Sequence, residues 1–213
     1  MNVGRRMSHP VITVPPELQI TKAHELMAHE KIGQMPVLKE TRLVGIVSEN
    51  DILRAYPSTA TTLAVWEIAS LIEKIKVKDV MTRDVHIVQE DTLIQDAARV
   101  MVDNQISSLP VMHGKALVGI ITETDLFDIM LEMLGARRPG VHFSVLIANK
   151  PGEIAKITKA LFEKGGDITA LSTFEGDTSE NSMLSIKVNG IEQKALQKLV
   201  KPLVIRITEI GTD

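Results

Sequence analysis

The chain has 213 residues, of which 44% are hydrophobic and 24% charged, a balance that suits packed cores and argues against disorder. Its net charge of -3, with acids and bases mixed throughout, argues against nucleic acid as the main partner. The absence of cysteine excludes disulfides, thiolate metal sites and a cysteine nucleophile.

Two further properties bear on location and partners. Aromatic residues make up only 3% of the chain, so single-stranded nucleic acid would find few rings on which to stack its bases. The basic N-terminal stretch is not followed by an apolar signal region, and no stretch reaches the apolar length of a transmembrane helix. We therefore expect a cytoplasmic protein without a membrane partner.

The first two thirds of the chain contain an internal repeat. When residues 7–53 are laid on residues 81–127 without a gap, about fifteen of some forty-seven pairs are identical, against roughly three expected by chance. In each copy the hydrophobic pattern predicts the order β-α-β-β-α. The first strand is expected at 11–14 and at 85–88, and the next begins with Pro36 or Pro110 at its first position.

Residues 54–77 separate the two copies. Their apolar residues recur at helical spacing, which predicts an amphipathic linker helix that bridges the repeats or forms a dimer contact. We place the first domain at 3–60, the linker helix at 61–76 and the second domain at 77–135. Because each repeat has an apolar sheet face to cover, the two should pack together.

Each repeat carries the motif Gly-x-x-[Ser/Thr]-x-x-Asp where its last strand meets a helix. The motif ends in Ser48 and Asp51 in one copy, and in Thr122 and Asp125 in the other. A hydroxyl and free N–H groups at a helix start suit a phosphate, and the Asp can accept hydrogen bonds from both hydroxyls of a ribose. A capping box would explain a single copy equally well, but two copies in matched context favour a ligand site.

With these motifs the first two thirds resemble tandem CBS domains, the paired regulatory module that binds adenosine nucleotides. The resemblance implies two sites, each of which takes adenine contacts from one repeat and ribose-phosphate contacts from the other. The first site would comprise Ser8, Val11, Thr13, Ile32, Gly33, Thr122 and Asp125. The second would comprise Thr82, Val85, Ile87, Ile106, Ser107, Ser48 and Asp51. His9 and Arg83 occupy equivalent positions and are candidate phosphate partners or solvated surface residues.

The last third, residues 141–213, predicts β-α-β-β-α-β, the order of a ferredoxin-like fold. Its turn at 149–152 and its glycine-rich helix exit at 165–168 resemble the ACT domain, a small-molecule sensor often specific for amino acids. Where many members have Asp and Asn, this chain has Asn149 and Asp167. A ligand would then contact Asn149, Pro151, Gly152, Asp167 and Ile168, and the alternative is a domain that only dimerises.

The residues do not form a recognisable catalytic or metal site. His24 and His29 are five residues apart and fall about 140° apart on a helix, so they do not share the face that a zinc protease requires. We expect neither an enzyme nor a catalytic cofactor. The fold class is α/β (α+β), a tandem CBS pair with a C-terminal ferredoxin-like ACT domain, and this order is similar to the acetoin-utilisation protein B family.

The resemblance implies a homodimeric regulator that reads adenine nucleotides, and through its ACT domain an amino acid, for an unknown protein partner. Three alternatives stay open. They are a structural assembly module without ligand, an enzyme that uses Glu49 and Asp51 as an acid–base pair, and an adenylate-tuned nucleic-acid binder.

Overall fold

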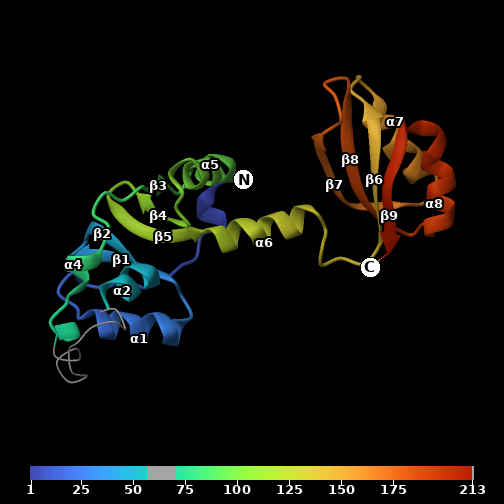
Figure 1. Cartoon of the computed structure of the whole chain (residues 1–213). Helices are drawn as coiled ribbons and strands as arrows, with labels where there is room; N and C mark the ends of the chain where they lie inside the picture. Colours follow the sequence, from blue (N-terminus) through green and yellow to red (C-terminus); the bar gives the residue numbers. More distant parts are fainter. Residues whose placement is uncertain (57–70, 213) are drawn as a thin grey trace. The chain divides into compact units, whose positions relative to one another are not determined.

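The computed structural model describes residues 1–56 and 71–212. The chain divides into two compact units, Met1–Leu126 and Phe127–Asp213 (Figure 1). Most of the expected linker helix at 61–76 lies outside the described residues.

The first unit contains both sequence repeats. The first repeat supplies η1 (Val3–Arg5), α1 (Ile20–Glu30), β1 (Gln34–Lys39), β2 (Arg42–Ser48) and α2 (Glu49–Ala55). The second supplies α4 (Val77–Val80), β3 (Val88–Gln89), α5 (Ile94–Asn104), β4 (Ser108–His113), β5 (Ala116–Thr122) and the start of α6 (Glu123–Met133). Strands β1 and β2 pair antiparallel, as do β4 and β5, and α1 and α5 lie on opposite sides of these strands (Figure 1).

The two repeats match in detail. Helices α1 and α5 both end at a left-handed residue, Lys31 with φ 57° and Gln105 with φ 54°. Both β-hairpins have a register shift at the same place, after Val37 and after Val111. The duplication seen in the sequence is therefore a duplication of backbone geometry.

The expected first strand of each repeat is much shorter than 11–14 or 85–88. Of residues 11–14 in the first repeat, only Val14 pairs with β1. Its N–H donates to the Pro36 carbonyl (3.1 Å), and its carbonyl accepts from the Leu38 N–H (2.9 Å). The next donor in this parallel ladder would be the N–H of Pro36, which proline lacks, so the pairing ends there. Pro36 is also the third residue of β1, not the first as expected, and the equivalent Pro110 is third in β4.

The repeats are joined by exchanged segments. Ser8 pairs antiparallel with Ile120 of β5, through N–H···O bonds of 2.8 and 3.1 Å. Thr82 pairs in the same way with Ile46 of β2, with both bonds at 2.9 Å. The segment that leads into each repeat thus extends the sheet of the other repeat, and the two copies form one unit.

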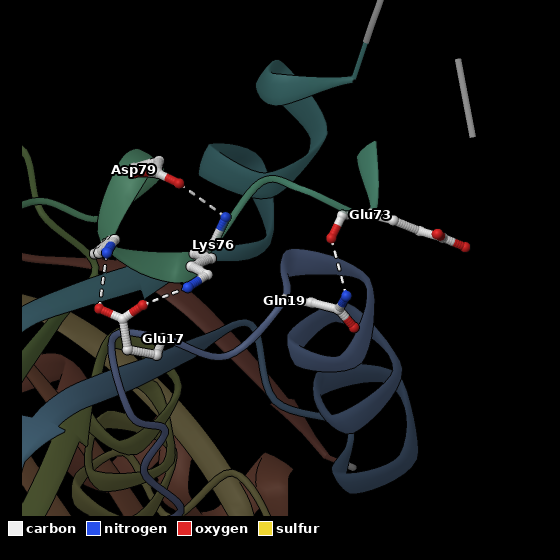
Figure 2. Close-up of polar contacts among 6 residues, drawn as sticks. Glu17, Gln19, Glu73, Lys76 and Asp79 are labelled. Carbon is white, nitrogen blue, oxygen red and sulfur yellow. Dashed lines mark hydrogen bonds and ion pairs between the residues drawn. The ribbon is translucent and has the colours of Figure 1, made fainter. Parts of the chain in front are cut away.

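An ion-pair cluster fixes the entry to the second repeat. The Glu17 carboxylate accepts from the Nζ atoms of Lys76 (2.6 Å) and Lys78 (2.8 Å), and Gln19 Nε2 donates to the Glu73 carbonyl (2.9 Å) (Figure 2). The hydrogen bonds from Lys76 and then Lys78 lower the pKa of Glu17 to about 2. At the positions related to these by the 74-residue repeat, Asp91 corresponds to Glu17, and Asn2 and Gly4 correspond to Lys76 and Lys78. This cluster therefore breaks the internal symmetry.

The second unit is an antiparallel sheet backed by two helices on one face (Figure 1). Its elements are β6 (Val141–Ala148), α7 (Glu153–Glu163), β7 (Asp167–Glu175), β8 (Asn181–Asn189), α8 (Gln193–Val200), η2 (Lys201–Leu203) and β9 (Arg206–Thr212). The strand order is β7-β8-β6-β9, and the core includes Phe143, Ile157, Leu184 and Leu196, all with no exposed surface. The expected β-α-β-β-α-β order is thus present.

Candidate functional site

Two clefts lie between the repeats in the first unit. The first cleft has a volume of about 370 Å³ and is lined by Ser8, Lys31, Ile32, Gly33, Gln34, Ser107, Ser108, Ile120, Thr122, Glu123, Thr124 and Asp125. The second has a volume of about 290 Å³ and is lined by Gln34, Ile46, Ser48, Asn50, Asp51, Thr82, Asp84, Val85, His86, Gln105, Ile106, Ser107 and Ser108. Each cleft takes residues from both repeats.

The motif residues form a capping box at the start of each helix. Asp51 Oδ2 accepts from the Ser48 N–H (2.9 Å) and hydroxyl (2.6 Å), and the Asp51 N–H donates to Ser48 Oγ (3.2 Å). Thr122 and Asp125 repeat this geometry at 2.8, 2.7 and 3.3 Å. The capping role and the ligand role use different atoms, because the cap engages only one carboxylate oxygen of each Asp.

The second carboxylate oxygen differs between the clefts. Oδ1 of Asp125 accepts a long hydrogen bond of 3.4 Å from the Ser8 hydroxyl. Oδ1 of Asp51 accepts none from the residues that the structure describes, and Thr82 stands where the first repeat has Ser8. Each cleft therefore presents a carboxylate oxygen that can accept hydrogen bonds from a ligand hydroxyl, and the oxygen in the second cleft is the less engaged.

The two clefts share one wall. Gln34, Ser107 and Ser108 line both of them. The Gln34 side chain donates to the Ser107 hydroxyl and accepts from the Ser108 hydroxyl, so its amide is oriented by the opposite repeat. A change of this wall reaches both clefts at once.

Most of the predicted site residues line the expected cleft. The first cleft contains Ser8, Ile32, Gly33, Thr122 and Asp125. The second contains Thr82, Val85, Ile106, Ser107, Ser48 and Asp51.

Five predicted residues do not line either cleft: Val11, Thr13, His9, Ile87 and Arg83. In the extended lead-in to the first repeat, side chains alternate between two sides, and Ile12 and Val14 are the ones that pack on the core. Val11 and Thr13 alternate with these two residues, although Val85, the equivalent of Val11 in the second repeat, does line its cleft. Ile87 and Arg83 line a different hollow near the hairpin tips.

Several lining residues are not among those that the sequence motifs predicted. Lys31 and Gln105 stand at equivalent positions and line the first and second cleft, each at the left-handed end of its helix. Gln34 and Ser108 are a second equivalent pair. Both pairs lie at equivalent positions of the two repeats but differ in residue type, so identical positions alone do not reveal them.

His24 and His29, which do not share a helix face, each lie near a glutamate. His24 Nε2 lies 3.4 Å from Glu49 and His29 Nδ1 lies 2.9 Å from Glu30. Across residues 1–56 and 71–212 there is no group of three or more His, Cys, Asp or Glu side chains that could hold a metal ion. In the same residues, no helix is both long and apolar enough to cross a membrane.

The two repeats of the first unit match a known domain family. The profile of the CBS domain matches the chain twice, at residues 3–58 and 77–132. The chain belongs to the CBS-domain family. An uncharacterized protein of Methanocaldococcus jannaschii is 36% identical over 130 residues, which cover 50% of this chain and 77% of the relative. The matched region spans only 54% of a second protein of that organism, and 33% of an inosine-5'-monophosphate dehydrogenase of Thermoplasma acidophilum that is 29% identical.

Solved structures resemble the CBS pair of this chain. A Vibrio cholerae protein, which its name links to acetoin utilization, is 28% identical with a TM-score of 0.54, over 64% of this chain and 95% of its own. CBSX2, crystallised with AMP, is 28% identical with a TM-score of 0.53, over 62% and 97%. A CBS pair crystallised with 5'-methylthioadenosine and S-adenosyl-L-methionine is 26% identical with a TM-score of 0.52, over 65% and 98%.

Proposed function

We propose that the chain is a regulatory sensor of adenine nucleotides that binds its ligand without transforming it. The observation that carries the proposal is the pair of clefts between the repeats, each with a hydroxyl and a carboxylate at the start of a helix. Similar CBS pairs that were crystallised with AMP, and with 5'-methylthioadenosine and S-adenosyl-L-methionine, support it.

The cleft residues suit the parts of such a ligand. The Oδ1 atoms of Asp51 and Asp125, which take no part in the caps, would accept hydrogen bonds from the two ribose hydroxyls. At Asp125 the ligand would replace the long hydrogen bond from Ser8. Ile32 and Ile106, each in its own cleft, would cover one face of the adenine. Lys31 adds a positive charge to the first cleft, where its counterpart in the second is the neutral Gln105. This difference gives the first cleft a lining ammonium group for a ligand phosphate, which the lining of the second cleft does not include.

A ligand that touches both repeats would stabilise one arrangement of the pair over another. A differential affinity of about 1–3 kcal/mol between two arrangements is enough for a useful switch. The shared Gln34 wall would let one cleft sense occupancy of the other, since the same amide borders both.

For the second unit we propose an ACT domain that senses an amino acid or forms a homodimer. The strand order β7-β8-β6-β9 with two helices supports this. So does the turn before α7, where the N-cap residue Gly152 has a φ of 92°. Asn149 Nδ2 donates to the Ser179 carbonyl (3.2 Å), so a ligand there would compete for that amide. A thermal-shift screen of amino acids tests ligand binding, and light scattering tests the dimer.

A role in acetoin utilisation is part of the proposal and rests on the likeness to the Vibrio cholerae protein. Deletion of the gene in its host tests it. Slower growth on acetoin, but not on glucose, would support the role, and equal growth on both would remove it.

Isothermal titration calorimetry with AMP, ADP and ATP tests the nucleotide proposal. We expect binding to the full chain, and at least a tenfold loss in the double variant Asp51→Asn with Asp125→Asn, because asparagine keeps a cap acceptor but loses the charge. Asp79→Asn is a matched control, since Asp79 also accepts from a helix-start N–H, that of Lys76 (2.9 Å), but does not line either cleft.

Two results would contradict the proposal. One is an absence of binding by all three nucleotides, together with a melting temperature that none of them changes, as the alternative of a purely structural module requires. The other is a double variant that binds as tightly as the Asp79→Asn control, which would mean that the clefts are not the nucleotide sites.

A further inference from the structure

A second pair of hollows lies where the β1–β2 and β4–β5 hairpin tips meet. The larger has a volume of about 760 Å³, and we name it the hairpin-tip pocket; it is lined by Thr41, Arg42, Leu43, Arg83, Asp84, Val85, Ile87, Met112, Gly114 and Lys115. The smaller, of about 450 Å³, is lined by Leu38, Glu40, Thr41, Lys115, Ala116 and Leu117. Thr41 and Lys115 line both, as Gln34 and Ser108 do for the clefts.

The two hollows are related by the internal repeat. Every residue of the smaller hollow stands at a position equivalent to a residue of the hairpin-tip pocket, for example Ala116 to Arg42 and Glu40 to Gly114. Two copies of one backbone site have therefore acquired different side chains. The smaller hollow, with Glu40 and Lys115 as its charged residues, serves as an internal reference for the larger.

The difference between the two is a concentration of positive charge. Arg42, Arg83 and Lys115 line the hairpin-tip pocket, and Asp84 is its one lining carboxylate. Arg42 and Lys115 do not pair with any carboxylate among the described residues, and the Arg83 guanidinium donates to the backbone carbonyl of Lys78 (3.3 Å), which leaves its charge without a counter-ion. Three cations around a hollow with one acid attract an anion of at least two charges.

The chemistry of the cations indicates the kind of anion. Guanidinium groups donate forked pairs of hydrogen bonds that fit the oxygens of a phosphate, and the lysine adds a mobile point charge. Met112 is the buried residue of the lining, with 6% of its surface exposed, whereas Arg42, Arg83 and Lys115 are exposed and can reach an anion from solvent.

We propose that the hairpin-tip pocket binds a phosphate-bearing anion through Arg42, Arg83 and Lys115. The phosphate belongs either to a free polyphosphate or to the tail of a nucleotide held in the second cleft, because Asp84 and Val85 border both spaces. This site is separate from Asp51 and Asp125. Binding of a free polyphosphate does not depend on the proposed nucleotide function, whereas binding of a nucleotide tail rests on it.

Calorimetric titration of the full chain with inorganic triphosphate, AMP and ATP tests the proposal. The variants are Arg42→Ala and Lys115→Thr, which install the residues that the other repeat carries at these positions and so are compatible with the fold. Lys22→Ala, the loss of an exposed cation on α1, controls for net charge. We expect triphosphate affinity to fall at least about tenfold in both variants and not in the control.

The titrations with triphosphate, AMP and ATP distinguish the two sources of phosphate. If triphosphate binds and both variants weaken it, the pocket accepts a free anion. If triphosphate alone does not bind, but the variants weaken ATP and leave AMP unchanged, the pocket holds the nucleotide tail. If both variants bind triphosphate and ATP as tightly as Lys22→Ala does, the proposal is wrong, whether or not AMP binds in the clefts.

Ionic strength provides a second readout. Because the site acts through exposed charges, triphosphate affinity should fall steeply when salt rises from about 0.1 M to about 1 M, as the Debye length shrinks from about 10 Å to about 3 Å. An affinity that does not change with salt would contradict binding by these cations.

Discussion

The packing of the exchanged segments on two glycines gives a sharp test of how the repeats interlock. A Cβ atom added at Gly45 in β2 would lie 2.5 Å from Met81 Sδ and 2.9 Å from the Thr82 carbonyl oxygen. That carbonyl accepts the 2.9 Å hydrogen bond from Ile46, so the backbone of the exchanged segment would have to shift. We expect Gly45→Ala to lower the free energy of unfolding by about 1–3 kcal/mol, the usual range for overpacking.

Gly119, the equivalent residue in β5, supplies a graded comparison. The three nearest atoms to a Cβ there all belong to the Met7 side chain, including Cγ at 2.7 Å, and a methionine can change rotamer. Gly119→Ala should therefore cost less than Gly45→Ala. Gly33→Ala is the control, because nothing lies within 4 Å of its added Cβ, and it should not destabilise.

Urea denaturation of the full chain measures these differences. A double-mutant cycle then separates side-chain clashes from backbone clashes. Met7→Ala should relieve most of the cost of Gly119→Ala, with a coupling of about 1 kcal/mol. Met81→Ala should leave much of the cost of Gly45→Ala, since the Thr82 carbonyl oxygen remains. Full stability of Gly45→Ala, or its full rescue by Met81→Ala, would refute the reasoning.

Three further predictions follow from individual contacts. The pKa of Glu17 is lowered from 4.5 to about 2, so its contribution to stability is present above about pH 4.5 and is lost as pH falls toward 2; Glu17→Gln should lose less stability over that window in melting curves. Gln34→Leu should cost about 1–3 kcal/mol in denaturant unfolding, because the Ser107 and Ser108 hydroxyls lose their partner, and removing both hydroxyls as well should recover part of it. Phe143→Ala, at a fully buried position of the second unit, should cost about 3–5 kcal/mol by the same assay, whereas a cost below 1 kcal/mol would contradict the packing described.

The sequence by itself determined the duplication and the local structure of each repeat. The repeated motif that contains Ser48 and Asp51, and Thr122 and Asp125, predicted a helix start directly after a strand, and the structure confirms it in both copies. Gly135, two residues after α6, has a left-handed φ of 64°, which glycine adopts readily beyond a helix end. These features depend on residues within a few positions of one another, which is why sequence patterns reveal them.

Only the tertiary structure decided which residues meet across the repeats. The first strand is short because Pro36 has no N–H to donate to the segment that contains Val14. The sequence of either segment alone does not show that the two pair. Gln34 borders both clefts because the opposite repeat orients its amide, and Arg42 joins Lys115 because two hairpin tips meet. Long-range pairing places these side chains, and residue order along the chain carries little information about it.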